Sequence, residues 1–466
     1  MTVDRETMLT WCRRLLGLDP AYPKLPLDDY LAAIPRLDSL SDLPSGTAVL
    51  VRGDLDAKPG PKVGEGDIRL RSMKETLEFG RQRGWRQIVF GHIGRKPEES
   101  LKKVAARLAE ILGTDVPLID NWLDEASLEV RQAAVDAIRR SPAGSIVMLE
   151  NTRRYEIERV LWKAGADDLP QLADRLVRLA DTVAERLGRV CVNEALSAGS
   201  LDASTTILPA AMDRVALGKY VAAEFDGPML RCLETRLVIF SGLKIDKLDD
   251  LEAMIGRGKI RMVIAAGSLA MALKKAAARL DGKDFSLGLA EKPDHRDKPY
   301  YIGEDRIAQA ERMIADGRKK GIEFVLPVDF VLQDGTVSET IPPDGQQLDI
   351  GTKTSALFAA KVGEFIEKYR GKDAVVFHNG VFGMFEDPRF ERGTREFMAQ
   401  LKRLKEAGAE VYVGGGEGGT ALERYGSPSD VTHVFTAGGT VLNALGNEPV
   451  PYLVALKMTA EKSRKQ

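Results

Sequence analysis

Cysteine and histidine are scarce in this chain of 466 residues. It has three cysteines, and no two of them have the CxxC spacing of a zinc or redox site. Its four histidines are scattered along the sequence and form no metal-binding cluster. We therefore expect reduced, unpaired thiols, as in a cytoplasmic protein.

Long apolar runs and an excess of one charge are also missing. No run approaches the ~20 apolar residues that span a bilayer, and the N-terminus is charged where a signal peptide would be apolar. The 67 basic and 69 acidic residues leave a net charge of -2. Because no overall field favours nucleic acid or an anionic membrane, we expect a cytoplasmic protein that binds neither.

Ten short apolar runs are the main feature that the chain does have. Each ends in a small polar or glycine-rich cluster, and helical stretches such as 100–112 and 129–140 lie between them. Buried parallel strands read as continuous apolar runs, and their alternation with helices predicts an α/β fold. Ligands of parallel sheets bind beyond the carboxyl ends of the strands. The clusters therefore mark two candidate ligand-binding edges, one in each half.

The edge in the second half is rich in glycine and lysine. The glycine run over 414–419 follows an apolar run and precedes a predicted helix at 421–425, a setting in which backbone N–H groups approach phosphate. The run also satisfies G-x-G-x-x-G, but the next strand ends in 436–440 without the acid that would hold a ribose, which counts against NAD. Lys244 and Lys247 follow another predicted strand and suit triphosphate charge.

The edge in the first half is rich in arginine, whose fork suits carboxylate or phosphate. An anionic acceptor opposite a nucleotide implies phosphoryl transfer, which needs positioning and positive charge more than a covalent nucleophile. No Ser/His/Asp or Cys/His grouping competes with this interpretation. The arginines at or near predicted strand ends are Arg69, Arg71, Arg95, Arg153 and Arg154.

The order of these motifs resembles the phosphoglycerate kinase family over about 48–457. The segment 51–56 (VRGDLD) looks like the family's V-R-x-D-x-N, 91–95 (GHIGR) like S-H-L-G-R, 149–153 (LENTR) like L-E-N-x-R, and 414–417 (GGGE) like G-G-G-D. The resemblance implies a Mg²⁺-dependent transfer of phosphate between ATP and the carboxylate of 3-phosphoglycerate, with domain closure. It also implies two small-molecule partners, an anionic carboxylate and an adenine nucleotide, and we expect a monomer.

The resemblance implies roles for individual residues as well. Asp54, Asp56 and Arg69 would contact the acceptor carboxylate, and Arg69 would also stabilise the phosphoryl group during its transfer. The acceptor's distal phosphate would be held by His92, Arg95 and Arg153. Catalytic roles are implied for Arg69, Lys244, Gly415 and Gly438, and the metal role for Glu417. Nucleotide binding is implied for Lys244, Lys247, Gly267, Asn379, Glu386, Gly414, Gly415, Gly416, Glu417 and Gly418.

We predict two Rossmann-like, three-layer α/β domains with parallel sheets that flank a hinged cleft. The expected parts are an N-terminal helical extension (1–45), an acceptor-binding domain (46–215), an interdomain helix or linker (216–235), a nucleotide-binding domain (236–440), and a C-terminal segment returning toward the N-terminal domain (441–466).

One segment departs from the family pattern. Where the family has N-D-A-F-G-x-x-H-R-x-H-x-S-T, the chain has Leu201 at the arginine position and Ser200 and Ala203 at the histidine positions. Charge-assisted hydrogen bonds are worth about 1.5–3 kcal/mol each, so 3-phosphoglycerate should bind weakly. We therefore predict a divergent kinase that phosphorylates another anionic carboxylate. The alternatives are ordinary glycolytic phosphoglycerate kinase, a non-catalytic nucleotide-binding paralogue and an NAD-dependent oxidoreductase.

Overall fold

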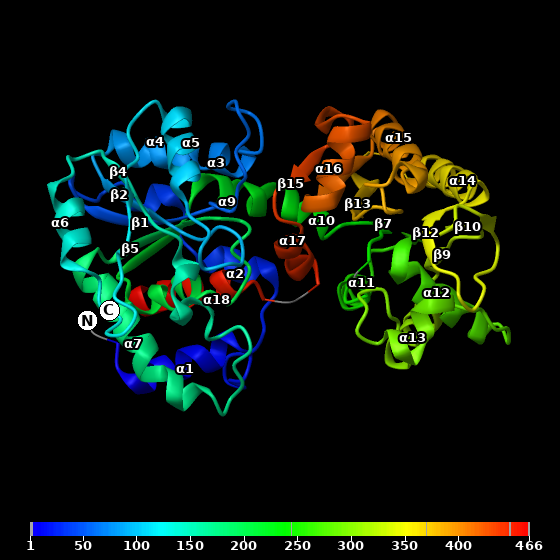
Figure 1. The fold of residues 1–466 in the computed structure, drawn as a ribbon, viewed down its shortest axis with the longest axis horizontal. Coiled ribbons are helices and arrows are strands. Elements are labelled where there is room, and N and C mark those ends of the chain that lie inside the picture. The colour runs from blue at the N-terminus through cyan, green and yellow to red at the C-terminus, as the bar shows by residue number, and fades with distance from the viewer. Residues whose placement is uncertain (1–2, 244, 370, 447–448, 465–466) are drawn as a thin grey trace. The chain divides into compact units, whose positions relative to one another are not determined.

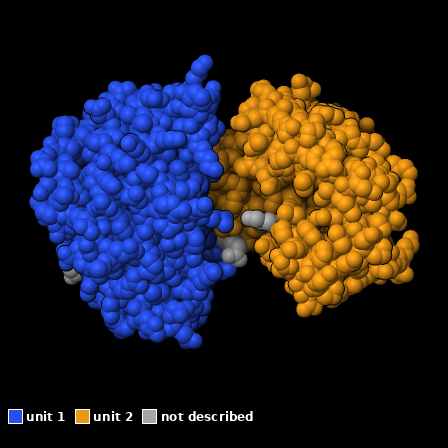
Figure 2. Space-filling model, in the orientation of Figure 1, with its two compact units in different colours: residues 1–226, 448–466 blue, residues 227–447 orange. Residues whose placement is uncertain are grey.

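Parallel sheets of six strands organise both halves of the computed structural model, which describes residues 3–243, 245–369, 371–446 and 449–464 (Figure 1). The chain divides into two units (Figure 2). Unit 1 is Met1–Asp226 with Glu448–Gln466, and unit 2 is Gly227–Asn447. The predicted α/β class with two parallel sheets is confirmed.

The sheet of unit 1 has the strand order β3-β4-β2-β1-β5-β6, and each neighbouring pair is parallel. Every residue of β4 and β5 is buried, as expected for strands of a parallel sheet covered by helices. The strands are β1 (Ala48–Gly53), β2 (Arg86–Phe90), β3 (Leu118–Ile119), β4 (Ile146–Leu149), β5 (Val190–Glu194) and β6 (Arg214–Leu217). The helices are α1 (Arg5–Leu15), α2 (Leu27–Ala33), α3 (Ile68–Ser72), α4 (Lys74–Gln82), α5 (Lys102–Leu112), α6 (Gln132–Arg140), α7 (Leu169–Arg186), α8 (Ala203–Thr206), α9 (Lys219–Glu224) and α18 (Pro451–Arg464).

Segments from both ends of the chain pack within unit 1. α1 begins after Asp4, whose side chain accepts a hydrogen bond from the N–H of Thr7 at 2.7 Å. Its apolar face is buried, and Trp11 Nε1 donates to the carbonyl oxygen of Thr206 at 2.8 Å. α18 is buried at every residue over 452–460, so it belongs to the core of this unit.

The sheet of unit 2 has the order β15-β14-β13-β7-β8-β9 and is again parallel throughout. A separate antiparallel sheet has the order β11-β10-β12. The strands are β7 (Leu237–Phe240), β8 (Met262–Ala265), β9 (Glu323–Val325), β10 (Phe330–Leu332), β11 (Val337–Ser338), β12 (Gln347–Ile350), β13 (Val375–Asn379), β14 (Glu410–Gly414) and β15 (His433–Phe435). The helices are α10 (Leu230–Cys232), α11 (Lys247–Gly256), α12 (Gly267–Leu280), α13 (Glu304–Lys319), α14 (Thr352–Lys368), α15 (Arg392–Glu406), α16 (Gly415–Tyr425) and α17 (Gly438–Leu445).

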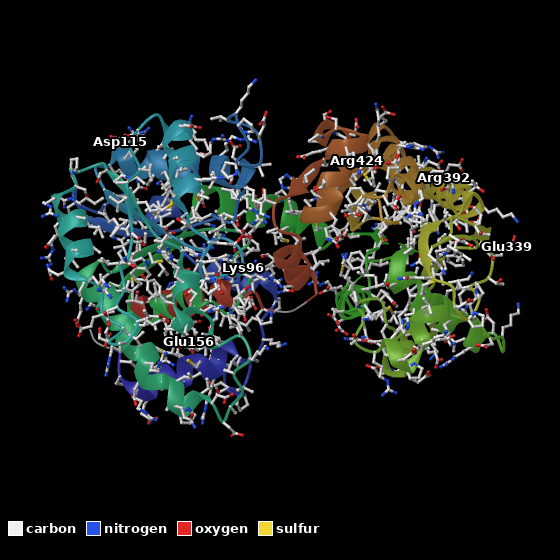
Figure 3. All side chains as sticks on the ribbon, viewed as in Figure 1. Lys96, Asp115, Glu156, Glu339, Arg392 and Arg424 are labelled. Carbon is white, nitrogen blue, oxygen red and sulfur yellow. The ribbon has the colours of Figure 1, made fainter. Side chains whose placement is uncertain are left out.

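Charged side chains of both signs project from each unit, as the near-zero net charge predicts (Figure 3). The three cysteines are buried and free, which confirms the expectation of unpaired thiols. Among the described residues, no helix combines the length and the apolar composition of a membrane span.

Candidate active site

The strand order of unit 2 reverses between β7 and β13. From β7 the chain continues to β8 and β9 on one side, whereas β13 is followed by β14 and β15 on the other. Loops diverge at such a point and open a crevice in which α/β sheets bind their ligands. A cavity of about 390 Å³ lies here, lined by residues that follow β7, β8 and β13.

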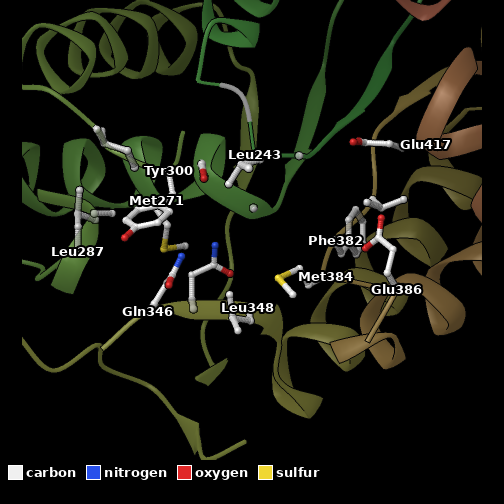
Figure 4. A pocket seen from close by; sticks show the side chains of 18 residues that line it. Leu243, Met271, Leu287, Tyr300, Gln346, Leu348, Phe382, Met384, Glu386 and Glu417 are labelled. Atoms are coloured by element: carbon white, nitrogen blue, oxygen red, sulfur yellow. The ribbon is translucent and has the colours of Figure 1, made fainter. Parts of the chain in front are cut away.

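The two sides of this cavity differ in chemistry (Figure 4). Met271, Leu287 and Tyr300 line one side, and Glu386 and Glu417 reach it from the opposite side. The apolar side suits the flat ring of a base, whereas carboxylates suit hydroxyl groups or a cation bound to phosphates. The cavity therefore has the size and polarity that a nucleotide requires.

Backbone groups approach each other closely beside the cavity. Gly267 begins α12 with a φ of +65°, and a Cβ there would lie 2.6 Å from the carbonyl oxygen of Gly242. Lys247 begins α11, and its Nζ donates to the carbonyl oxygen of Ser241 at 2.6 Å. This bond holds an ammonium group at the end of β7, where it suits phosphate charge. Lys244 lies outside the described residues.

The glycine run leads into α16, which extends further toward the N-terminus than the helix expected at 421–425. A kink at Gly416, with φ 53° and ψ -121°, separates Gly415 from the regular part of the helix. A Cβ at Gly415 would lie 2.5 Å from the backbone nitrogen of Gly438, where α17 begins. Glycine thus allows two helix N-termini to meet, and the N–H groups of helix N-termini attract phosphate.

Asn379 joins the ends of the neighbouring strands β13 and β14. Its Nδ2 donates to the carbonyl oxygen of Gly414 at 3.3 Å, and a Cβ at Gly438 would lie 3.5 Å from the same nitrogen. Gly418 is buried against Val413, which a Cβ would approach to 3.1 Å. The structure therefore brings Asn379 and the predicted glycines together at one sheet edge.

In unit 1, Arg69 lies between two aspartates at the end of β1. Its Nη1 is 3.6 Å from Asp54 Oδ1 and 3.5 Å from Asp56 Oδ2. Asp54 is buried and accepts a hydrogen bond from Ser197 Oγ at 2.7 Å, and Asp56 accepts one from the N–H of Gly94 at 3.0 Å. The guanidinium is thus fixed at the sheet edge, while 26% of the Arg69 side chain stays exposed to an incoming anion.

His92 and Arg153 come together around a buried carboxylate, that of Asp202. Arg153 Nη2 lies 3.0 and 3.3 Å from the two oxygens of Asp202, Trp162 Nε1 donates to Oδ1 at 2.8 Å, and His92 Nδ1 lies 3.1 Å from Oδ2. Burial alone would raise the pKa of Asp202, but the charges of Arg153 and Arg52 hold it below its usual value. Asp202 is therefore an anion inside the predicted phosphate site.

Two further buried groups complete this set. Arg52 Nη2 lies 2.8 Å from His92 Nδ1, and because arginine has only donors, Nδ1 accepts this bond. Burial lowers the pKa of His92, which agrees with a neutral ring. Glu158 accepts hydrogen bonds from the N–H and hydroxyl of Ser204, and burial and the Asp202 charge raise its pKa to about 7. We call Arg52, His92, Arg153, Glu158 and Asp202 the charge cluster.

The charge cluster differs from the set that the sequence predicted. Arg95 is exposed, and no hydrogen bond links it to the cluster in the described part of the chain. Sequence reasoning did not single out Asp202, Arg52 or Glu158. The sequence did offer one indication of Asp202: it is an acidic residue between the positions of an arginine and a histidine in the family pattern.

The fold and the two sites are typical of a two-domain α/β phosphotransferase: a nucleotide-sized cavity among helix N-termini in one unit, and arginines at a sheet edge in the other. The model of the family described as "Phosphoglycerate kinase" matches residues 40–448. The chain therefore belongs to the phosphoglycerate kinase family, and the resemblance drawn from its motifs is confirmed.

Individual relatives agree with this assignment. A phosphoglycerate kinase of Clostridium beijerinckii is 30% identical over 426 residues, covering 88% of this chain and 96% of the relative. One of Bifidobacterium longum subsp. infantis is 29% identical over 445 residues, covering 90% and 99%. The crystal structure of phosphoglycerate kinase from Pyrococcus horikoshii OT3 has the same fold, with a TM-score of 0.71 at 23% identity and coverage of 92% and 100%.

Family membership makes the chain an ATP-dependent kinase with a carboxyl group as acceptor, and its substrate complex contains Mg²⁺. Among the described residues no group of three or more histidine, cysteine or acidic side chains could hold a metal. Mg²⁺ bound with a nucleotide needs only one or two carboxylates besides the phosphates and waters. Glu417, exposed at the cavity, fits that requirement.

Proposed function

We propose that this chain moves the γ-phosphoryl group of ATP to or from the carboxylate of a small acid, which gives an acyl phosphate. The observation that carries the proposal is Arg69, which is held between Asp54 and Asp56 yet stays accessible. A guanidinium fixed in this way is preorganised for the negative charge of a transferring phosphoryl group. The nucleotide cavity of unit 2 supplies the donor site.

The chain's own groups act by binding and orienting. An acceptor carboxylate oxygen forms the new bond to phosphorus while the bond to the ADP oxygen breaks, and no covalent enzyme intermediate is needed. Arg69 donates hydrogen bonds to the group in transfer. The N–H groups at the starts of α16 and α17 and the ammonium of Lys247 hold the remaining phosphates. Mg²⁺, when bound, supplies further neutralisation of phosphate charge.

The comparisons favour one acceptor, because the relatives are named phosphoglycerate kinases. 3-Phosphoglycerate is accordingly the first candidate, and ordinary glycolytic phosphoglycerate kinase activity is the function that family membership supports best. We also propose that the protein is a monomer and lies in the cytoplasm. Gel filtration would test its oligomeric state, and cell fractionation would test its location.

A second candidate is a different carboxylate, as the loss of cations at 200–203 suggested. One observation favours it: Asp202, a carboxylate fixed on Arg153, lies in the site where the resemblance places the acceptor's distal phosphate. This candidate keeps the same reaction and changes only the acceptor.

A hydroxylamine trap tests the reaction class. Purified protein is incubated with ATP, Mg²⁺ and hydroxylamine, with 3-phosphoglycerate and a panel of non-phosphorylated carboxylic acids offered in turn. We expect an acyl hydroxamate with at least one acid, formed at least about a hundred-fold more slowly by Arg69→Ala. If the folded wild-type protein traps no product with any acid in the panel, the proposal is wrong.

A further inference from the structure

The charge cluster of unit 1 already contains the anion that its cations require. We propose that Asp202 is a built-in anion that takes the place of a substrate phosphate on Arg153, so that the acceptor is a monocarboxylic acid whose remaining part is uncharged. This inference rests on the proposed phosphoryl transfer to a carboxylate and names the class of its acceptor.

The charges of the cluster balance internally above about pH 7, where Glu158 is ionised. Arg52 and Arg153 contribute two cations, and Asp202 and Glu158 contribute two acids that face them. His92 adds no charge, because its Nδ1 accepts a hydrogen bond from Arg52 and burial lowers the pKa of the ring. A buried binding site for phosphate needs surplus positive charge to replace the water that the anion loses. With Glu158 ionised, this cluster has none.

Most donors of the cluster are also engaged, and the exception is Arg153 Nε, which is buried without a hydrogen-bond partner among the described residues. Arg153 Nη2 faces the Asp202 carboxylate, and Arg153 Nη1 donates to the carbonyl oxygen of Gly94 at 2.7 Å. Arg52 donates hydrogen bonds to the carbonyl oxygen of Gly53, to His92 Nδ1 and to Thr205 Oγ1. A phosphate would have to displace Asp202, which is tethered to the chain and held by the side chains of Arg153 and Trp162.

An exposed indole ring lies beside this neutralised site. Trp162 donates its N–H to Asp202, and its ring lies 4.8 Å from the guanidinium carbon of Arg153 while 38% of the residue stays exposed. Leu201, next to Asp202 in the chain, stands where the family pattern has an arginine. An exposed indole and a leucine beside a neutral cluster suit the uncharged part of an acid, not a second anionic group.

Anion rescue provides the test. Asp202→Ala removes the built-in anion and leaves Arg153 without its partner, so inorganic phosphate should replace the carboxylate. Melting temperatures are measured at pH 8, where Glu158 is ionised, at constant ionic strength with and without phosphate. We expect phosphate to stabilise Asp202→Ala and Asp202→Asn markedly and the wild type little. Asp213→Asn, a change at an exposed acid of the same unit, should behave like the wild type.

Calorimetric titration makes the same comparison quantitative. Phosphate should bind the Asp202 variants roughly ten- to a hundred-fold more tightly than the wild type, the range expected for one or two charge-assisted hydrogen bonds. Equal affinities in the wild type and a folded variant would overturn the proposal. If neither variant folds, the wild type decides: a Kd for phosphate below about 1 mM contradicts the proposal, and weaker binding supports it.

Turnover identifies the acceptor class. For the wild type, kcat/KM should be higher with glycerate and other uncharged-tail acids than with 3-phosphoglycerate, and Asp202→Asn should shift that ratio toward 3-phosphoglycerate by at least about ten-fold. A wild type that prefers 3-phosphoglycerate overturns the inference and leaves the proposed reaction intact. A protein that phosphorylates no acid refutes the proposed reaction, while the phosphate titration still reports on Asp202.

Discussion

The nucleotide cavity of unit 2 and the charge cluster of unit 1 lie at equivalent positions, beyond the carboxyl ends of a parallel sheet, but they are built differently. Around the cavity the close approaches are made by backbone groups, as between Gly415 and Gly438. The charge cluster consists of buried side chains that bind one another, with Asp202 at its centre.

This difference has a consequence for specificity. Phosphate contacts made by backbone N–H groups change little when side chains are exchanged, so we expect the nucleotide side to keep its ligand class as the sequence diverges. A site made of side chains changes its charge with one substitution. We therefore expect variants of unit 1 to alter which acid reacts, and variants of the glycine-rich edge to impair nucleotide binding for every acid.

The largest effect is expected at Arg69, the cation that serves the reaction itself. Arg69→Ala should lower kcat by a hundred-fold or more, roughly the effect of deleting one oxyanion-hole donor, and nucleotide affinity should barely change. Steady-state kinetics and nucleotide calorimetry measure the two quantities. Arg178→Ala, at an exposed arginine on α7, is the matched control. A variant at Arg69 that keeps most of its kcat would remove this residue from the mechanism.

The sequence predicted the parallel strands well because they are buried on both faces and are therefore continuously apolar. β4 begins and ends where its apolar run does, at Ile146 and Leu149. The start of α16 could not be predicted in this way, because glycine disfavours helices in isolation. The close approach of Gly415 to Gly438 explains the glycine there, because a Cβ would not fit, and a linear pattern does not reveal that contact.

A second prediction concerns Glu194, a carboxylate buried in unit 1 that pairs with no arginine among the described residues. It accepts hydrogen bonds from the N–H groups of Tyr220 and Val221, yet burial raises its pKa to about 7. Because the pKa of Glu194 is higher in the folded state, the protonated group favours folding fully at pH values below its unfolded-state pKa of 4.5. This contribution to stability is lost as the pH rises through about 7, the folded-state pKa. Asp202, with a lowered pKa, contributes with the opposite sign, stabilising above its unfolded value.

Glu194→Gln should remove this pH dependence. Relative to the wild type, the variant should gain on the order of 3 kcal/mol in the free energy of unfolding between pH 4.5 and pH 8. Urea denaturation across that range measures the difference. Glu185→Gln, at an exposed acid on α7, should show no such trend. A constant difference between Glu194→Gln and the wild type would mean that Glu194 does not titrate as described.

Side-chain networks were the part of the site that the sequence could not reveal. Motif positions located His92 and Arg153, but nothing in the spacing of residues shows that Asp202 turns inward and binds Arg153 beside His92. Arg95 belongs to the same motif as His92, and its side chain instead projects into solvent. Pairing of charges depends on rotamers and on depth in the fold, which a linear pattern does not encode.

A smaller effect is expected for Glu417 at the nucleotide cavity. Glu417→Gln removes one negative charge from the group that fits magnesium, so it should weaken Mg·ADP binding by about ten-fold, the cost of roughly one charge-assisted bond. Binding of ADP in the presence of a chelator should stay unchanged or improve slightly. Calorimetry with and without Mg²⁺ separates the two cases, and Glu423→Gln on the same helix is the control. Equal losses with and without the metal would contradict the metal role.

The smallest effect is expected for Leu201→Arg, which restores the family's arginine beside the charge cluster. The new guanidinium adds one cation, but Asp202 still pairs with Arg153. The Asp202 carboxylate could also pair with the new arginine in place of the acceptor. Binding of 3-phosphoglycerate should therefore improve by only a few-fold, near the lower limit for a hydrogen bond to a charged group. In combination with Asp202→Asn the same arginine should give a larger gain, because no internal carboxylate competes for it. Calorimetry on the two single variants and the double variant measures this coupling, and strictly additive gains would show that Asp202 does not compete with the acceptor.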